Sequence, residues 1–166
     1  MSFFRIKKVK GNEYVYIVEN EWKTKGSRQK VKEYIGKAYR FNLKNDIAFH
    51  EFIKIEDVGK YVNETDKTKI FNDLIEWEFL KSGISRNEFS VEFAKKEILK
   101  SNKKIALLIN DGFLCSNTLK NLLEFKTEGN EENDGYRFAR AFVESGIKVP
   151  QDVFIGLFGK LYKSAE

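Results

Sequence analysis

The chain has 166 residues, of which 42% are hydrophobic and 14% aromatic, and this composition predicts a folded core and excludes a disordered protein. Its single cysteine excludes an internal disulfide and a thiolate metal cluster. The first residues lack the apolar stretch of a secretory signal, and the longest apolar run, 105–109, is too short to span a bilayer. We therefore expect a soluble, cytoplasmic protein without a membrane partner.

The net charge of +5 is unevenly distributed along the chain. Residues 1–40 contain eleven Lys or Arg and four Glu, an excess of seven positive charges, whereas the remaining residues are slightly acidic in total. Such an asymmetry favours a local surface that binds polyanions. The alternative is an ordinary lysine-rich surface that only keeps the protein in solution.

Three strands are predicted at the N-terminus, over residues 3–10, 13–22 and 28–41. The second strand is rich in Tyr, Val and Ile that recur with period two, which is typical of a half-buried strand. The turns between the strands are short and contain glycine, so neighbouring strands must run antiparallel. The segment is predicted to form a three-stranded antiparallel meander.

The middle of the chain is predicted to contain helices and a second β-hairpin. In chain order we expect a connection over 42–55 that can include a short strand, a short helix over 56–64, a longer helix over 65–83, and two or three antiparallel strands within 88–110, with a tight turn at 100–103. The longer helix would begin at Thr65 as its N-cap and end at Gly83. Its apolar stripe, with charged residues opposite, is formed by Ile70, Leu74, Trp77 and Lys81, flanked by Phe71, Glu78 and Leu80.

The last third of the chain is predicted to be mainly helical. Ser116 or Asn117 can cap a helix over Leu119, Leu122 and Leu123. We expect an acidic, mobile loop over 127–134, a helix over 134–145, and a final helix over 150–163 that has Pro150 in its first turn.

The fold class is therefore predicted to be α+β: an N-terminal three-stranded antiparallel β-meander, then helices with a second β-hairpin and a helical C-terminus. As domains we expect a basic β-meander module over 1–41 and a mixed region over 42–166. The two parts can also share one sheet and form a single domain.

The basic hairpin over 13–37 carries the functional hypothesis. Strict alternation places Tyr14 and Tyr16 on the same side as the third-strand cations Arg28, Lys30 and Lys32. Val15 and Ile17 would then pair with Val31 and Ile35 on the buried side. Lysines can neutralise phosphates while tyrosine rings stack on bases, so this surface is predicted to bind nucleic acid, with further phosphate contacts from Lys7, Lys8, Lys10, Lys23 and Lys25. The alternatives are a solvated edge strand and a surface for a protein partner.

The same stretch resembles a known family. Tyr14, Tyr16, Val18 and Glu19, then Arg28, Gln29, Val31, Tyr34, Ile35 and Gly36, match the pattern of the N-terminal β-module of IS4-like insertion-sequence transposases. The match covers about 25 of the 166 residues, and the remainder of the chain is similar to uncharacterised archaeal proteins. The resemblance implies a DNA-associated module without a transposase core, so DNA is favoured over RNA as the partner.

The sequence contains no complete catalytic constellation. The Glu-x-Lys at 124–126 lies in a helical pattern, without the preceding Asp on a neighbouring strand that a metal nuclease would need. His50 has no nucleophile motif beside it, and Cys115 is expected to pack as a small apolar group, although a helix N-terminus could make its thiol reactive. We expect no enzymatic activity, no metal and no cofactor.

The last helix supports a second hypothesis about function. Together with the preceding helix and the glycine turn between them it has the outline of a helix-turn-helix. A recognition helix should present polar side chains, however, and this helix is apolar around nearly its whole circumference. Gly156 and Gly159 flatten one side, which suits close helix packing or a twofold contact. An adaptor protein or homodimer would use this surface, with Phe154, Leu157, Phe158 and Leu161 at the interface.

Overall fold

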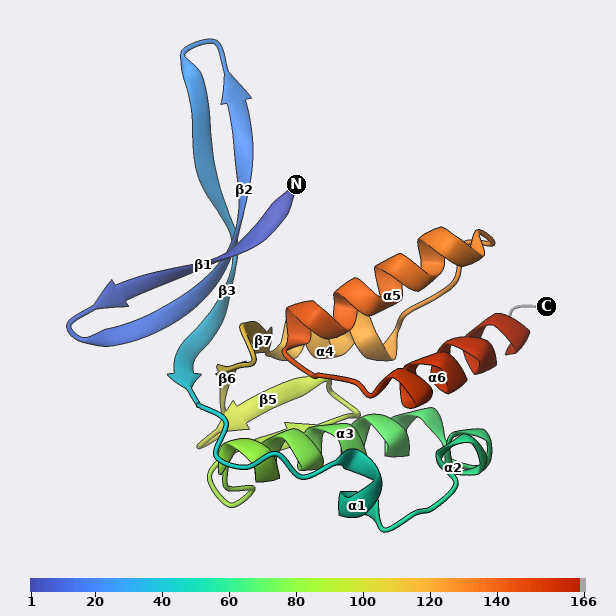
Figure 1. The fold of residues 1–166 in the computed structure, drawn as a ribbon. Helices are drawn as coiled ribbons and strands as arrows, with labels where there is room; N and C mark the ends of the chain where they lie inside the picture. Colours follow the sequence, from blue (N-terminus) through green and yellow to red (C-terminus); the bar gives the residue numbers. More distant parts are fainter. Residues whose placement is uncertain (165–166) are drawn as a thin grey trace.

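The computed structural model describes residues 1–164 and has an α+β fold, which confirms the predicted class (Figure 1). The strands are β1 (Ser2–Val9), β2 (Asn12–Lys23), β3 (Gly26–Arg40), β4 (Ser90–Glu92), β5 (Glu97–Lys100), β6 (Lys103–Ile109) and β7 (Gly112–Leu114). The helices are α1 (Phe49–Ile53), α2 (Val58–Glu64), α3 (Lys67–Ser82), α4 (Ser116–Leu123), α5 (Glu131–Ser145) and α6 (Gln151–Ser164). The meander, the second hairpin and the predicted helices are all present.

Several boundaries differ from the predicted ones. The connection over 42–55 contains α1 and no strand. Asp66, not Thr65, caps α3 through a bond from the Thr68 backbone N–H, and α4 begins after Cys115. The loop predicted over 127–134 contains the first turn of α5. Asn130 caps this helix, and the acidic residues after it interact favourably with the positive end of the helix dipole.

All seven strands belong to one sheet with the order β1-β2-β3-β6-β5-β4, and β7 also pairs with β6. The strands pair antiparallel except for β3 and β6, which are parallel over Lys37–Arg40 and Ile105–Leu108. A parallel pair needs a long crossover, here supplied by α1–α3 and the β4–β5 hairpin. The N-terminal meander and the rest of the chain are thus joined in the same sheet.

The approach of β3 to β6 depends on Gly36. Its φ is +148°, and a Cβ atom built there would lie 2.3 Å from the carbonyl oxygen of Lys104. Any larger residue would force the two backbones apart, because the contacting atom is main chain and cannot move aside.

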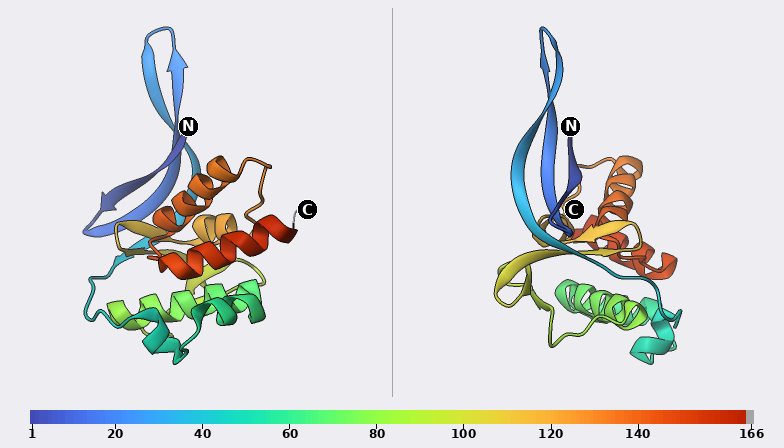
Figure 2. Two further views of the ribbon diagram at one scale, coloured as in Figure 1. Left: turned by 45° about the vertical axis from the view of Figure 1, so that its right-hand side comes forward. Right: turned by 90° about the vertical axis from the view of Figure 1, so that its left-hand side faces the viewer.

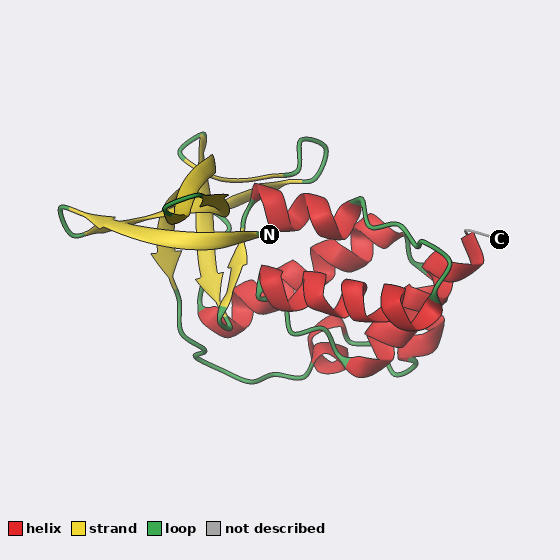
Figure 3. Ribbon diagram, turned by 90° about the horizontal axis from the view of Figure 1, so that it is seen from above, coloured by secondary structure: helices red, strands yellow, loops and turns green. Residues whose placement is uncertain are grey.

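The protein has two hydrophobic cores, one on each side of β6. Ile105, Leu107 and Ile109 face the larger core, which contains most buried side chains of the helices. Ala106 and Leu108 face a smaller core with Cys115 and with Val15, Ile17, Ile35 and Ala38 of the meander. The view from above in Figure 3 shows the result: strands gather at one end of the molecule and helices at the other.

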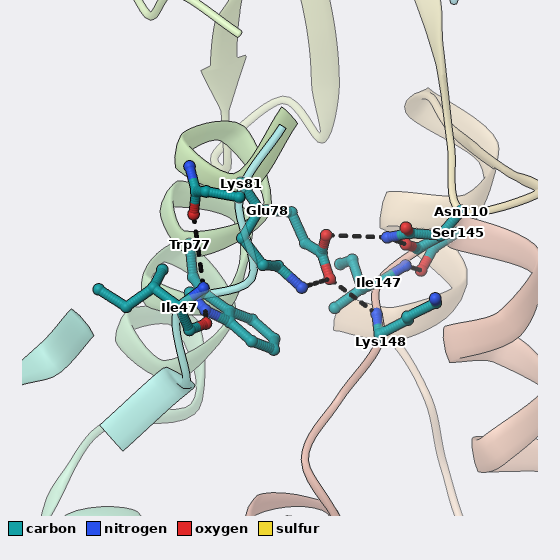
Figure 4. Close-up of polar contacts among 10 residues, drawn as sticks. Ile47, Trp77, Glu78, Lys81, Asn110, Ser145, Ile147 and Lys148 are labelled. Carbon is teal, nitrogen blue, oxygen red and sulfur yellow. Dashed lines mark hydrogen bonds and ion pairs between the residues drawn. The ribbon is translucent and has the colours of Figure 1, made fainter. Parts of the chain in front are cut away.

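The predicted apolar stripe of α3, formed by Ile70, Leu74, Trp77 and Lys81, is buried, and among the residues predicted to flank it only Leu80 is exposed. Glu78 and Lys81 are 0% and 3% exposed, whereas Leu80 is 46% exposed. Glu78 accepts hydrogen bonds from Lys81 Nζ (3.1 Å), Asn110 Nδ2 (2.8 Å) and the Lys148 backbone N–H (2.9 Å) (Figure 4). The Lys81 ammonium also lies 3.4 Å from the centre of the Trp77 ring. This network joins α3 to the β6–β7 turn and to the segment between α5 and α6.

The distal part of the β2–β3 hairpin projects from the rest of the molecule. β1 pairs with β2 only as far as Glu19, and β6 pairs with β3 only from Lys37 onward. Between these points, residues 20–29 form a ribbon of two strands that stands clear of the helices in both views of Figure 2. We call this ribbon the arm.

Candidate nucleic-acid interface

Two irregularities in the β2–β3 pairing decide which side chains share a face. The register shifts between Val15 and Tyr16 and again between Ile17 and Val18, and the shifts leave Ile35 and Lys32 of β3 without an opposite residue. Each extra residue reverses the alternation of β3 relative to β2. Tyr34 therefore lies opposite Tyr16, while Lys30 and Arg28 lie opposite Glu19 and Glu21.

One face of the meander, here called the tyrosine face, contains aromatic rings and cations. Residues directly opposite each other in the register have side chains on the same side of the sheet, and this rule defines the face. Its members are Phe3, Arg5, Lys7 and Val9 of β1, Asn12, Tyr14, Tyr16, Val18, Asn20 and Trp22 of β2, and Ser27, Gln29, Val31, Tyr34 and Lys37 of β3. The set includes no Asp and no Glu.

The opposite face, here called the glutamate face, contains all four acids of the first 40 residues. Its charged members are Lys8, Glu13, Glu19, Glu21, Lys23, Arg28, Lys30, Lys32, Glu33 and Arg40. Ion pairs join Lys30 to Glu21 at 3.2 Å and Arg40 to Glu13 at 2.7 Å, with longer ones at Lys32–Glu19 (3.7 Å) and Lys23–Glu21 (3.9 Å). Such exposed pairs add little stability, but they offset much of the positive potential of this face.

The predicted grouping of Tyr14 and Tyr16 with Arg28, Lys30 and Lys32 is wrong, because the three cations lie on the glutamate face. Lys23 and Lys8 are on that face too, and Lys10 and Lys25 occupy the turns at opposite ends of β2. Of the ten predicted contact residues, the structure brings together Tyr14, Tyr16 and Lys7. The predicted pairing of Val31 with Val15 and Ile17 on the buried side is also wrong: Val31 lies opposite Val18 and is 46% exposed.

The tyrosine rings form a cluster across the middle of the tyrosine face. Ring centres are 5.1 Å apart for Tyr16 and Tyr34 and 6.5 Å for Tyr14 and Tyr34. The Lys7 ammonium lies 4.9 Å from the centre of the Tyr16 ring, within range of a cation–π interaction. Partial burial, followed by the neighbouring hydroxyls of Tyr16 and Tyr14, raises the pKa of Tyr34, which favours its neutral, hydrogen-bond-donating form.

Cations flank this cluster on both sides. Lys7 and Lys37 lie opposite Tyr14 from the two neighbouring strands, and Arg5 lies opposite Tyr16. Within residues 1–164 none of these three cations forms an ion pair, and Arg5 instead donates a hydrogen bond to Gln29. Their charge is therefore available to an anionic ligand.

Sequence reasoning missed four residues of this surface: Arg5, Trp22, Tyr34 and Lys37. Trp22 is the most exposed aromatic side chain of the arm, with 83% of its surface accessible. Its position just before a basic turn was readable from the sequence. The position of Tyr34 was not, because it depends on the bulge at Lys32.

Other concave surfaces of the described chain mix both signs of charge. One of them has a volume of about 500 Å³ and lies between α4 and α5, where it is lined by Lys120, Arg137 and Arg140 together with Glu124 and Glu144. Arg140 donates to Glu144 at 2.8 Å, so these charges are already paired. Within residues 1–164, no group of three or more His, Cys, Asp or Glu could hold a metal ion, and no helix has the length and apolar content to cross a membrane.

The apolar residues of α6 that were predicted to form an interface pack inside the protein. Leu157 is 1% exposed, and Phe154, Phe158 and Leu161 are partly buried against the larger core. The Phe154 ring lies 5.4 Å from that of Phe138 of α5. Gly156 allows close contact with α2, because a Cβ atom there would lie 2.8 Å from Val62. Gly156 and Gly159 were predicted to allow either close helix packing or a twofold contact. At Gly156 the structure shows close helix packing.

Cys115 and His50 occupy different environments. Cys115 is fully buried in the smaller core, as expected for a small apolar group, and burial raises the pKa of its thiol, which disfavours the reactive thiolate. His50 lies exposed on α1 beside a small depression that includes Pro150 and Asp152.

No protein-family model, curated protein or solved structure matches this chain.

Proposed function

We propose that this protein is a non-enzymatic nucleic-acid-binding protein, with DNA as the favoured ligand, and that the tyrosine face is its contact surface. The observation that carries the proposal is the segregation of charge: all four acids of the meander lie on one face, and the other face combines Arg5, Lys7 and Lys37 with aromatic rings. Cations neutralise phosphates, and phenol rings and hydroxyls can contact bases and sugars. The preference for DNA comes from the resemblance of residues 13–37 to transposase N-terminal modules.

Binding is expected to weaken with salt in proportion to the number of phosphates contacted. Three unpaired cations predict a slope of log K against log salt of about −2 for single strands and about −2.7 for duplexes. Affinity should then fall roughly 15- to 40-fold between 50 and 200 mM salt. Fluorescence anisotropy with labelled single-stranded DNA, duplex DNA and structured RNA, in a salt series, measures this slope. An absence of binding to all three at 50 mM salt would remove the proposal.

The structure gives less support to an adaptor function through α6, since the side chains proposed for that interface pack against α2 and α5. We retain that hypothesis only as the alternative that a negative binding result would favour. In that case the protein should capture protein partners while its tyrosine face is unchanged. Substitution of Ile155, the α6 side chain that is 60% exposed, should then abolish the capture.

A further inference from the structure

The tyrosine face extends along the arm as an apolar and amide surface. Beyond the tyrosine cluster it continues with the exposed Val31 beside the buried Val18, then with Asn20 and Gln29, and finally with Trp22 near the end of the arm. Trp22 is six residues from Tyr16 on the same strand, a distance of about 20 Å at about 3.4 Å per residue. Within strands β1–β3, five large apolar side chains are exposed, and all five belong to this face: Phe3, Val9, Trp22, Val31 and Tyr34.

We infer that this surface binds single-stranded nucleic acid, with unpaired bases stacked on Tyr34 and Trp22 and phosphates held by Arg5, Lys7 and Lys37. The inference rests on the proposed function and specifies its ligand. In a duplex the faces of the bases are covered by their neighbours and only their edges are offered in the grooves. Exposed rings on a sheet can use the faces of bases only when the bases are unstacked.

The dimensions and chemistry of the face agree with this ligand. About 20 Å corresponds to roughly six bases at about 3.4 Å each, and fewer if the strand is stretched. Tyr34 is 54% exposed and Trp22 is 83% exposed, so both rings are open to a base. Between them Asn20 and Gln29 supply amide groups that can bond to base edges, and the absence of acids from the face leaves the phosphates without repulsion.

The two tryptophans of the chain make a direct test possible. Trp77 is 7% exposed, and its indole N–H donates to the Ile47 carbonyl at 2.8 Å, so a ligand on the arm should not change its emission. Unlabelled 12-mers of oligo(dT) and oligo(U) should quench the emission of Trp22. A Trp22→Phe variant, which reports Trp77 alone, should show no quenching.

Affinities measured by anisotropy then separate stacking from charge. Tyr34→Ala and Trp22→Ala should each weaken binding of labelled oligo(dT) about tenfold, whereas Tyr136→Ala, which removes a 68% exposed tyrosine from α5, should leave it unchanged. A blunt duplex of the same length should bind more weakly than the single strand.

The outcomes distinguish this inference from the function on which it rests. Tighter binding of the duplex, without quenching of Trp22 and without an effect of Tyr34→Ala, would overturn the stacking inference and leave nucleic-acid binding in place. Binding of oligo(U) but not oligo(dT), with quenching, would support stacking and remove the preference for DNA. No binding of any ligand at 50 mM salt would overturn both.

Discussion

Replacing Glu78 with alanine should lower the free energy of unfolding by about 3–5 kcal/mol. The Glu78 carboxylate is fully buried and accepts hydrogen bonds from Lys81, Asn110 and the Lys148 backbone. Its removal leaves the Lys81 ammonium buried without a counter-charge, and a buried unpaired charge is far costlier than the loss of one hydrogen bond. Urea denaturation followed by circular dichroism at pH 7 measures the change.

Two further variants make this result interpretable. Glu76→Ala on the same helix removes an exposed partner of Arg86, at 3.4 Å, and should cost less than about 1 kcal/mol. Combining Glu78→Ala with Lys81→Met removes both charges, so it should recover part of the stability that the single variant loses. Equal costs for Glu76→Ala and Glu78→Ala would contradict the claim that the buried Glu78 carboxylate, through Lys81, Asn110 and Lys148, stabilises the fold.

Neutralising the tyrosine face should reduce affinity for nucleic acid by at least about thirtyfold at 50 mM salt, which corresponds to about 2 kcal/mol. The variant Arg5→Gln, Lys7→Gln, Lys37→Gln removes the three cations of this face that have no ion-pair partner within the described residues. It should also flatten the dependence of affinity on salt, because fewer counterions are released. Anisotropy titrations with one labelled oligonucleotide measure both effects.

The matched control removes the same number of charges from the other side of the meander. Arg28→Gln, Lys30→Gln, Lys32→Gln acts on the glutamate face, where Lys30 and Lys32 already pair with Glu21 and Glu19. Its effect on affinity should stay below about fivefold, since it changes the overall field but no proposed contact. A larger loss in this variant than in the tyrosine-face variant would reverse the assignment of the binding face.

Much of the secondary structure could be predicted because local patterns determine it. The period-two alternation of β2 and the glycine turns on either side predicted the meander, and the caps and apolar spacing of α3 to α6 predicted the helices to within a few residues. The parallel pairing of β3 with β6 could not be predicted, because it joins strands separated by three helices and a hairpin.

The candidate site was predicted less well because the faces of β3 depend on two bulges. The sequence gives no signal for an extra residue at Lys32, and without it Tyr34 would share a face with Lys30. The irregular backbone and the close approach to β6 at Gly36 were not predicted either. The burial of Lys81 agrees with its place in the predicted stripe of α3. The contacts of Glu78 with Asn110 and Lys148 could not be predicted, because they come from elements distant in the sequence.

The most direct test of the tyrosine face as the binding surface is a lysine footprint. The unmodified protein would be acetylated under limiting conditions, with and without saturating oligonucleotide, and the extent of reaction at each lysine measured by mass spectrometry. We expect bound nucleic acid to protect Lys7 and Lys37 and to leave Lys30 and Lys32 as reactive as before. Protection of Lys30 and Lys32 with no change at Lys7 and Lys37 would contradict the proposal and place the ligand on the glutamate face.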